Sequence, residues 1–153
     1  MEDSKNFSFR RLCVLTTGSI YLQLILGAAL RHSKSGIVFH LAGALAVTVL
    51  VMLVVSRVFR YYPKVASLFR PAVVLSILLL GQLFLGIGSY LIRLAARQDI
   101  QPAVAMVTIT TAHVAVGALV LATSLILTLQ SYRVLSRANK MRRFSTAPQK
   151  VAL

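Results

Sequence analysis

The chain has 153 residues, of which 58% are hydrophobic and only 13% are charged, and its mean hydropathy is +0.80. A soluble domain of this length needs a more charged surface, so this composition excludes an ordinary water-soluble globular protein. The 17 Lys and Arg residues against 3 Asp and Glu residues give a net charge of +14. These cations stand between and beyond long apolar blocks, where anionic lipid headgroups attract them, so the charge favours a membrane over nucleic acid.

Four apolar blocks are long enough to cross a membrane, for which a helix needs about 20 residues. They predict an all-α, polytopic membrane protein with a bundle of four transmembrane helices. The predicted spans cover residues 12–30, 36–55, 72–92 and 103–129. Residues 1–11 are predicted to form a cytoplasmic N-terminal tail, and residues 132–153 a basic cytoplasmic C-terminal tail that is disordered on the membrane surface.

The distribution of Lys and Arg predicts the orientation of these spans. Thirteen of these residues lie in the two tails and the connection between the second and third spans, whereas four lie on the opposite side: Arg31, Lys34, Arg93 and Arg97. The positive-inside rule therefore places both termini in the cytoplasm, and we expect a multi-pass protein of the bacterial inner (plasma) membrane. The single cysteine, Cys13, excludes an internal disulfide.

The sequence contains an internal repeat. The segment QLILGA from Gln23 in the first span matches QLFLGI from Gln82 in the third. The segment HLAGALA from His40 in the second span matches HVAVGALV from His113 in the fourth, with one residue inserted. These matches predict two helical hairpins of related sequence, arranged about a pseudo-twofold axis along the membrane normal.

Two histidines are the ionisable residues inside the predicted spans, because no Asp, Glu, Lys or Arg lies in the middle of any of them. Ionisable groups within a membrane are costly, so His40 and His113 mark a candidate functional site. Both spans run from outside to inside under the predicted topology, which places both histidines in the outer half of the bilayer. The lack of a membrane carboxylate argues against a proton-coupled or small multidrug-type transporter.

Small residues share a helix face with each histidine, Gly43 with His40 and Gly117 with His113. They would let a flat macrocycle lie close to both helices, and two facing imidazoles can supply both axial ligands of a haem iron. We therefore predict haem b bound within a domain of residues 12–131. Its propionates would need cations near the outer surface, and the candidates are Arg31, Arg93 and Arg97.

Each haem-bound imidazole would donate its other N–H to an acceptor, and the Thr110 hydroxyl and the Ile109 carbonyl are candidates beside His113. The alternative is that each histidine only hydrogen-bonds to a neighbouring helix, with the nearby glycines serving packing. Gln23 and Gln82 are interpreted as side chains that hydrogen-bond between helices, which is a packing role rather than chemistry. A bare metal ion is disfavoured, because two histidines have no third protein ligand nearby. His32, in the short outer loop, is expected at the level of the headgroups.

The segment from Gln23 to His32 resembles the first helix of one half of a heme A synthase. A histidine early in the second helix, a Gln-x-x-Leu-Gly third helix from Gln82, and an Ala-His pair ending at His113 extend the resemblance over residues 22–133. Members of that family usually have eight helices in two halves, each half binding haem through a histidine pair, and they convert haem O to haem A during cytochrome oxidase maturation. The resemblance implies that His40 and His113 are the ligand pair.

Two departures from the family pattern bear on activity. The catalytic half of the family carries a glutamate close to the histidine of its second helix, whereas residues 35–39 contain no acid, and the paired outer-loop cysteines are missing. The chain therefore resembles the cofactor-binding half, which would pair with itself as a homodimer or with a partner membrane subunit of the oxidase assembly machinery. Two other functions stay open: an electron-transfer b-type membrane cytochrome, and a structural or assembly subunit without a cofactor.

Overall fold

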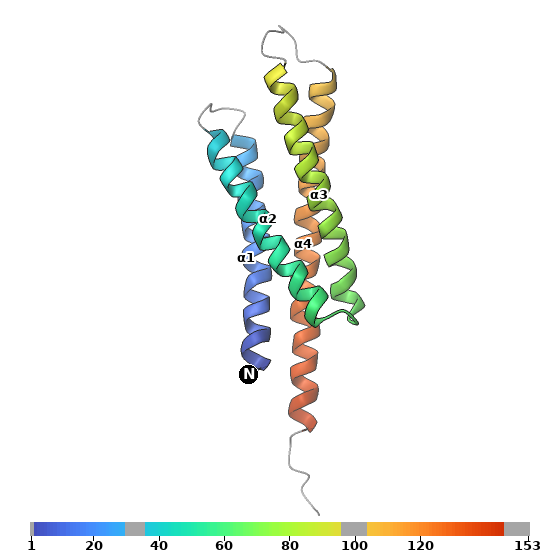
Figure 1. Cartoon of the computed structure of the whole chain (residues 1–153). Helices are drawn as coiled ribbons and strands as arrows, with labels where there is room; N and C mark the ends of the chain where they lie inside the picture. The colour runs from blue at the N-terminus through green and yellow to red at the C-terminus, as the bar shows by residue number, and fades with distance from the viewer. Residues whose placement is uncertain (1, 30–35, 96–103, 146–153) are drawn as a thin grey trace, which may run out of the picture.

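The computed structural model describes residues 2–29, 36–95 and 104–145, and within them every element is an α-helix (Figure 1). The four helices are α1 (Glu2–Ala29), α2 (Gly36–Tyr61), α3 (Ala66–Ala95) and α4 (Val104–Ser145). All four are long and apolar enough to cross a membrane. The predicted fold class, an all-α bundle of four transmembrane helices, is confirmed.

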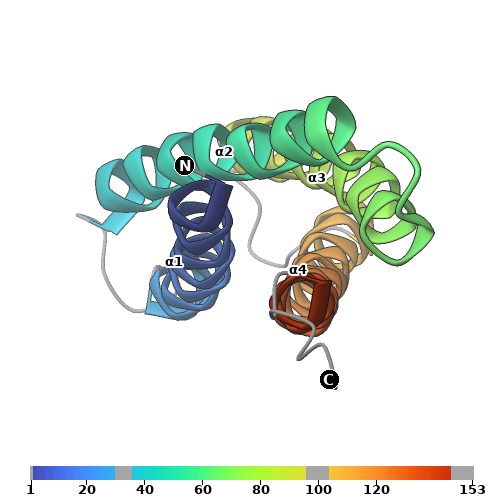
Figure 2. The same ribbon diagram turned by 90° about the horizontal axis from the view of Figure 1, so that it is seen from below.

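The helices run alternately up and down, and neighbours in sequence are neighbours in space (Figure 1). Helix α1 packs against α2 and α4, and α3 packs against α2 and α4, whereas the diagonal pairs α1–α3 and α2–α4 make no close backbone contact over the described residues. Seen along the bundle, α2 spans one side and leans from α1 across to α3 (Figure 2). The hairpins α1–α2 and α3–α4 are thus the two halves of the molecule.

The prediction of a disordered tail after residue 131 is wrong for its first part, because α4 continues without a break to Ser145. Residues 132–145 contain neither Gly nor Pro, and Leu135 is buried against the rest of the bundle. Good helix formers and one packed apolar side chain favour continuing the helix over ending it at the membrane boundary. Residues 146–153 lie outside the described part of the chain.

Three other helix ends extend beyond the predicted spans. Helix α1 begins at Glu2, within the predicted N-terminal tail. Helix α2 ends at Tyr61 and α3 begins at Ala66, so the connection between them has only residues 62–65. This connection is a tight turn in which Val65 N–H donates to the Tyr62 carbonyl at 3.1 Å. The basic segment between the second and third spans is therefore mostly helical.

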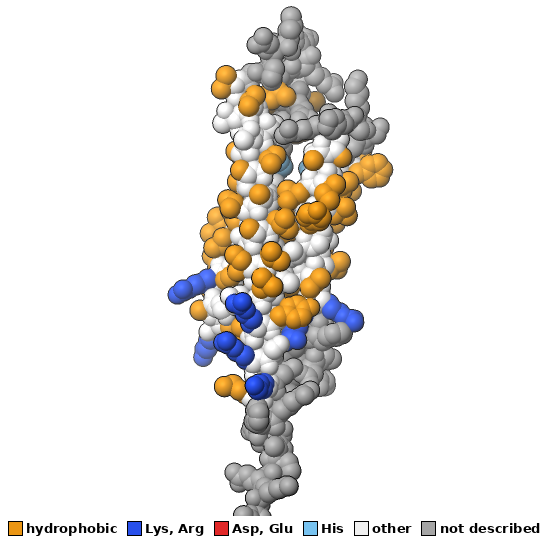
Figure 3. All heavy atoms as spheres, turned by 180° about the vertical axis from the view of Figure 1, so that it is seen from behind, with side chains coloured by type: hydrophobic (Ala, Val, Ile, Leu, Met, Phe, Trp, Pro, Cys, Tyr) orange, Lys and Arg blue, Asp and Glu red, His pale blue; other side chains and the backbone are white. Residues whose placement is uncertain are grey.

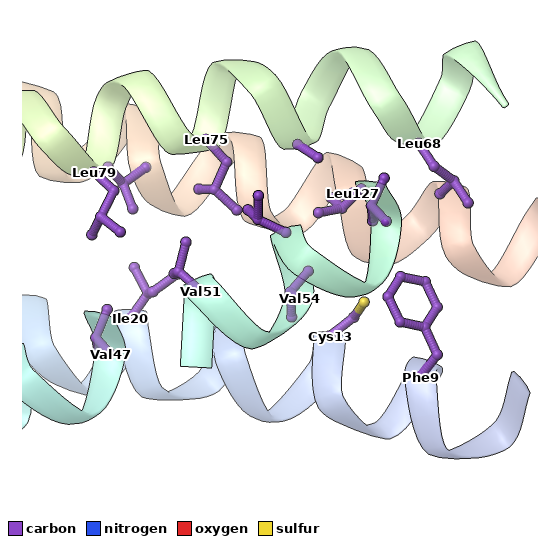
Figure 4. Close-up of a cluster of buried hydrophobic side chains, with 14 of the residues drawn as sticks. Phe9, Cys13, Ile20, Val47, Val51, Val54, Leu68, Leu75, Leu79 and Leu127 are labelled. Carbon is purple, nitrogen blue, oxygen red and sulfur yellow. The ribbon is translucent and has the colours of Figure 1, made fainter. Parts of the chain in front are cut away.

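The buried core lies in one half of the bundle, where side chains from all four helices meet (Figure 4). On each helix one residue marks the boundary of this core toward the other half of the bundle. These boundary residues are Ile20, Val47, Leu79 and Val120. Beyond them, among the described residues, Gly117 alone is buried and the other side chains of all four helices are half-buried or exposed. We call the half with the core the basic end, and the opposite half, which contains His40 and His113, the histidine end.

The basic end carries the start of α1, the end of α4, the turn between α2 and α3, and every Lys and Arg whose side chain the structure describes (Figure 3). These residues are Arg10, Arg11, Arg57, Arg60, Lys64, Arg70, Arg133, Arg137 and Lys140. Between the two ends, large apolar side chains are exposed on all four helices. Such a surface contacts membrane lipid, and the chain is a multi-pass membrane protein.

Candidate functional site

The two histidines lie at one level in the bundle. His40 stands seven residues before Val47 on α2, and His113 stands seven residues before Val120 on α4, and these valines are the first buried hydrophobic residues of their helices. At 1.5 Å per residue, each histidine is about 10 Å beyond the core.

In the first hairpin, His40 is held against α1 by a glutamine and a glycine. Gln23 Nε2 donates to the carbonyl oxygen of His40 at 2.7 Å and also lies 3.1 Å from His40 Nδ1. A Cβ placed on Gly27 would be 3.2 Å from His40 Cε1. The imidazole of His40 therefore packs directly against the backbone of α1 at Gly27, beside the carboxamide of Gln23.

The second hairpin repeats this arrangement. Gln82 Nε2 on α3 lies 3.4 Å from His113 Nε2 on α4. A Cβ on Gly86 would be 3.1 Å from His113 Cε1. The sequence repeat is thus a structural repeat, and each hairpin carries the same three-residue unit of glutamine, glycine and histidine.

A second glycine in each hairpin makes room for the carboxamide. A Cβ on Gly43 would collide with Oε1 of Gln23, and a Cβ on Gly117 would lie 3.0 Å from Nε2 of Gln82. These two glycines were predicted to make room for a flat macrocycle. In the structure they make room for glutamine side chains, and their role beside a macrocycle stays a prediction.

Among the described hydrogen bonds, His113 does not use the predicted partners on its own helix, and their role beside a bound haem stays a prediction. The Thr110 hydroxyl donates to the carbonyl oxygens of Met106 and Val107 at 2.7 and 3.1 Å, and the described hydrogen bonds of His113 do not include Ile109. Gln23 and Gln82 contact the neighbouring helix, as predicted, and the groups that they contact are the imidazoles. The signal that could have revealed this was the repeat itself, because it places a glutamine and a histidine at matching positions in both hairpins.

Several polar atoms of these units are buried without a hydrogen-bond partner: Oε1 of Gln23, Oε1 of Gln82 and Nδ1 of His113. An unpaired buried polar atom is destabilising by roughly 1–3 kcal/mol, and each one invites a functional explanation.

The histidine end is also where the bundle is least filled, and in the space-filling view histidine atoms lie inside a hollow between two columns of side chains (Figure 3).

The two histidines come from α2 and α4, the diagonal pair of helices that does not touch. Two imidazoles on opposite sides of an incompletely packed space can bind a flat group between them or hydrogen-bond within their own hairpins. In the described part of the chain, no group of three or more His, Cys, Asp and Glu residues is placed to hold a bare metal ion.

Other predicted site residues fall at the edge of the described structure or beyond it. Arg93 lies in the last turns of α3, and its side chain is not described. Arg31, Arg97 and His32 lie outside the described residues. The predicted role of the three arginines beside haem propionates therefore stays a prediction.

No protein-family model matches the chain, and neither a curated protein nor a solved structure matches it. The fold and site thus define a class, a four-helix membrane bundle with two matched histidine units, and the resemblance to heme A synthase stands on the sequence motifs alone.

Proposed function

We propose that this chain is a haem-binding integral membrane protein related to heme A synthase, with His40 and His113 as the axial ligands. The observation that carries the proposal is the pairing of two equivalent histidine units at one level, on helices that leave the space between them incompletely packed. Ionisable groups within a membrane are costly, so two matched ones at this level favour a functional role. The bundle core between facing helices is where such proteins place their cofactors.

The chemistry of the donor set fits haem. Imidazole nitrogens are common axial ligands of haem iron, and two histidines fill both axial positions. A bare zinc ion usually takes four ligands, so two histidines would not complete its coordination. Haem b held in this way supplies one-electron transfer without an open coordination position. The residues of this chain would supply the two ligands, the walls of the space and, with Arg93, Arg31 or Arg97, charge for the propionates.

We place this activity in haem A formation or cytochrome oxidase assembly in the bacterial inner membrane, with both termini in the cytoplasm. The absence of an acid in residues 35–39 assigns the chain a cofactor-carrying role, completed by a second copy or by a partner subunit. An electron-transfer cytochrome of another membrane complex would have the same spectrum, but its deletion would leave the haem A content of the cell unchanged.

A second candidate is a structural subunit without a cofactor, and one observation favours it: both histidines already contact a glutamine within their own hairpin. Such interhelical hydrogen bonds are a common use of polar residues in membranes. The unpaired buried atoms and the incompletely packed histidine end favour haem over this alternative, because packing alone would be expected to satisfy them.

The test is a reduced-minus-oxidised optical spectrum of the purified protein from cells supplied with haem. We expect a sharp low-spin haem spectrum in the wild type that is lost or strongly changed in His40→Ala and in His113→Ala. A colourless wild-type protein that stays folded in both variants would overturn the proposal and favour the structural subunit.

A further inference from the structure

Each hairpin places a glutamine against its histidine, Gln23 at Nδ1 of His40 and Gln82 at Nε2 of His113, although the two glutamines lie 59 positions apart in the sequence. Each precedes the glycine that supports the ring by four residues, so glutamine and glycine share one face of α1 or α3. Each carboxamide contacts a ring nitrogen, at 3.1 Å in the first hairpin and at 3.4 Å in the second. Packing alone would not require the same polar group on the same partner twice.

A carboxamide carries both a donor and an acceptor, whereas a neutral imidazole has one N–H and one lone pair. In this structure each carboxamide presents Nε2 to the ring, and Oε1 is buried without a partner. Rotating the carboxamide by 180° would present Oε1 instead and accept an N–H from the imidazole. The same side chain can therefore favour either tautomer of its histidine.

We infer that Gln23 and Gln82 are positioning residues that fix the orientation and tautomer of His40 and His113. The inference deepens the proposed function and rests on it for the identity of the bound group. A histidine that ligates a metal through one nitrogen almost always donates the other N–H to an acceptor, which fixes its orientation and raises its basicity. Each carboxamide presents Nε2 to the ring in this structure, and its unpartnered Oε1 becomes the acceptor for that N–H once the carboxamide rotates.

The two pairs are not equivalent. Gln23 also donates to the carbonyl oxygen of His40 at 2.7 Å, a bond that holds Nε2 in place and favours an unprotonated Nδ1. The described bonds of Gln82 include only the 3.4 Å contact with His113. In the haem-free protein, His40 is therefore held with its proton on Nε2, and Gln82 is the freer of the two carboxamides to rotate.

The first test needs no haem. Imidazole ¹⁵N chemical shifts in micelles, assigned with the His→Ala variants, should show one tautomer of His40, protonated on Nε2. Gln23→Met keeps the length of the side chain and removes the carboxamide, so we expect two tautomers of His40 in that variant. The matched control is Gln130→Met on α4, seventeen residues along the helix from His113. Shifts of His40 that are the same in Gln23→Met and in wild type would overturn the inference.

The second test uses added haem b. Gln82→Met should weaken haem binding by roughly 10–100-fold, because loss of an outer hydrogen-bond partner typically lowers metal affinity by that factor. It should also shift the reduction potential of the bound haem upwards, because the ligand becomes less basic, and Gln82→Glu should shift it downwards. A merely structural glutamine would leave the potential unchanged in both variants. If wild type binds no haem, the proposed function fails, and the ¹⁵N result alone decides the positioning role.

Discussion

At the residue scale, the feature that matters most is the bare helix surface under each imidazole. His113 Cε1 would be 3.1 Å from a Cβ on Gly86, whereas a Cβ on Gly81 of the same helix would meet nothing within 4 Å. The two glycines lie five residues apart on α3, in the same membrane span. Alanine at Gly86 tests whether the imidazole needs a bare helix surface, and alanine at Gly81 measures the general effect of replacing a glycine in this helix.

We predict that Gly86→Ala lowers the free energy of unfolding by about 1–3 kcal/mol, because the ring must move away from the new methyl group. The same variant should lower the haem content of the purified protein. Gly81→Ala should lower neither quantity, since alanine favours helix over glycine and finds open space. The free energy of unfolding is measured in a mixed detergent series, and the haem content is quantified per chain. Equal losses of stability and of haem in Gly86→Ala and Gly81→Ala would contradict the assignment of Gly86.

At the element scale, α1 and α4 are joined by a short row of hydroxyl groups. The Thr17 hydroxyl lies 2.7 Å from the Ser124 hydroxyl and 2.9 Å from the Thr128 hydroxyl. Ser124 and Thr128 are buried, so these bonds lie within the helix interface. Near the membrane boundary, Arg10 extends the contact by donating to the Ser136 hydroxyl at 3.1 Å. This polar row fixes how the first hairpin meets the second.

We predict that Thr17→Val lowers the free energy of unfolding by about 0.6 kcal/mol, and by no more than about 1.7 kcal/mol, the range known for interhelical hydrogen bonds in membranes. The control is Thr108→Val on α4, whose hydroxyl donates to its own helix at the Val104 carbonyl. A double-mutant cycle with Ser124→Ala isolates the bond between the two hydroxyls. A loss in Thr108→Val as large as in Thr17→Val would show that the row does not join the helices.

At the scale of the whole molecule, the distribution of charge along the bundle gives the strongest prediction. Four spanning helices return the chain to the side on which it began, so both termini lie on one side of the membrane. All the described Lys and Arg side chains lie at that end. From the positive-inside rule we predict that this side faces the cytoplasm.

Cysteine labelling in intact cells tests this orientation. In a Cys13→Ser background, Lys64→Cys in the turn between α2 and α3 should resist a membrane-impermeant maleimide until the cells are opened. Ser33→Cys, in the segment between α1 and α2, should react in intact cells. Reaction at position 64 before opening would invert the proposed topology. The wild-type protein is a separate control, because its Cys13 is buried and should stay unlabelled while the protein is folded.

Much of the fold could be read from the sequence, because a membrane span is a local property. Hydropathy summed over about 20 residues identifies each helix without reference to the others, and His40 and His113 stand out because ionisable groups are rare in such segments. The ends of the helices were less predictable. Residues 132–145 are polar enough to suggest a tail, yet Leu135 packs against the bundle and α4 continues.

The sequence by itself determined the class of protein, the number of spans, the two related hairpins and the candidate pair of histidines. The tertiary structure alone decided that Gln23 and Gln82 contact the imidazoles, that Gly43 and Gly117 make room for those glutamines, and that the core fills only the basic end. The physical reason is that these features depend on the rotation and crossing of each helix against its neighbours. That geometry is set by packing between residues far apart in the chain, which no local pattern records.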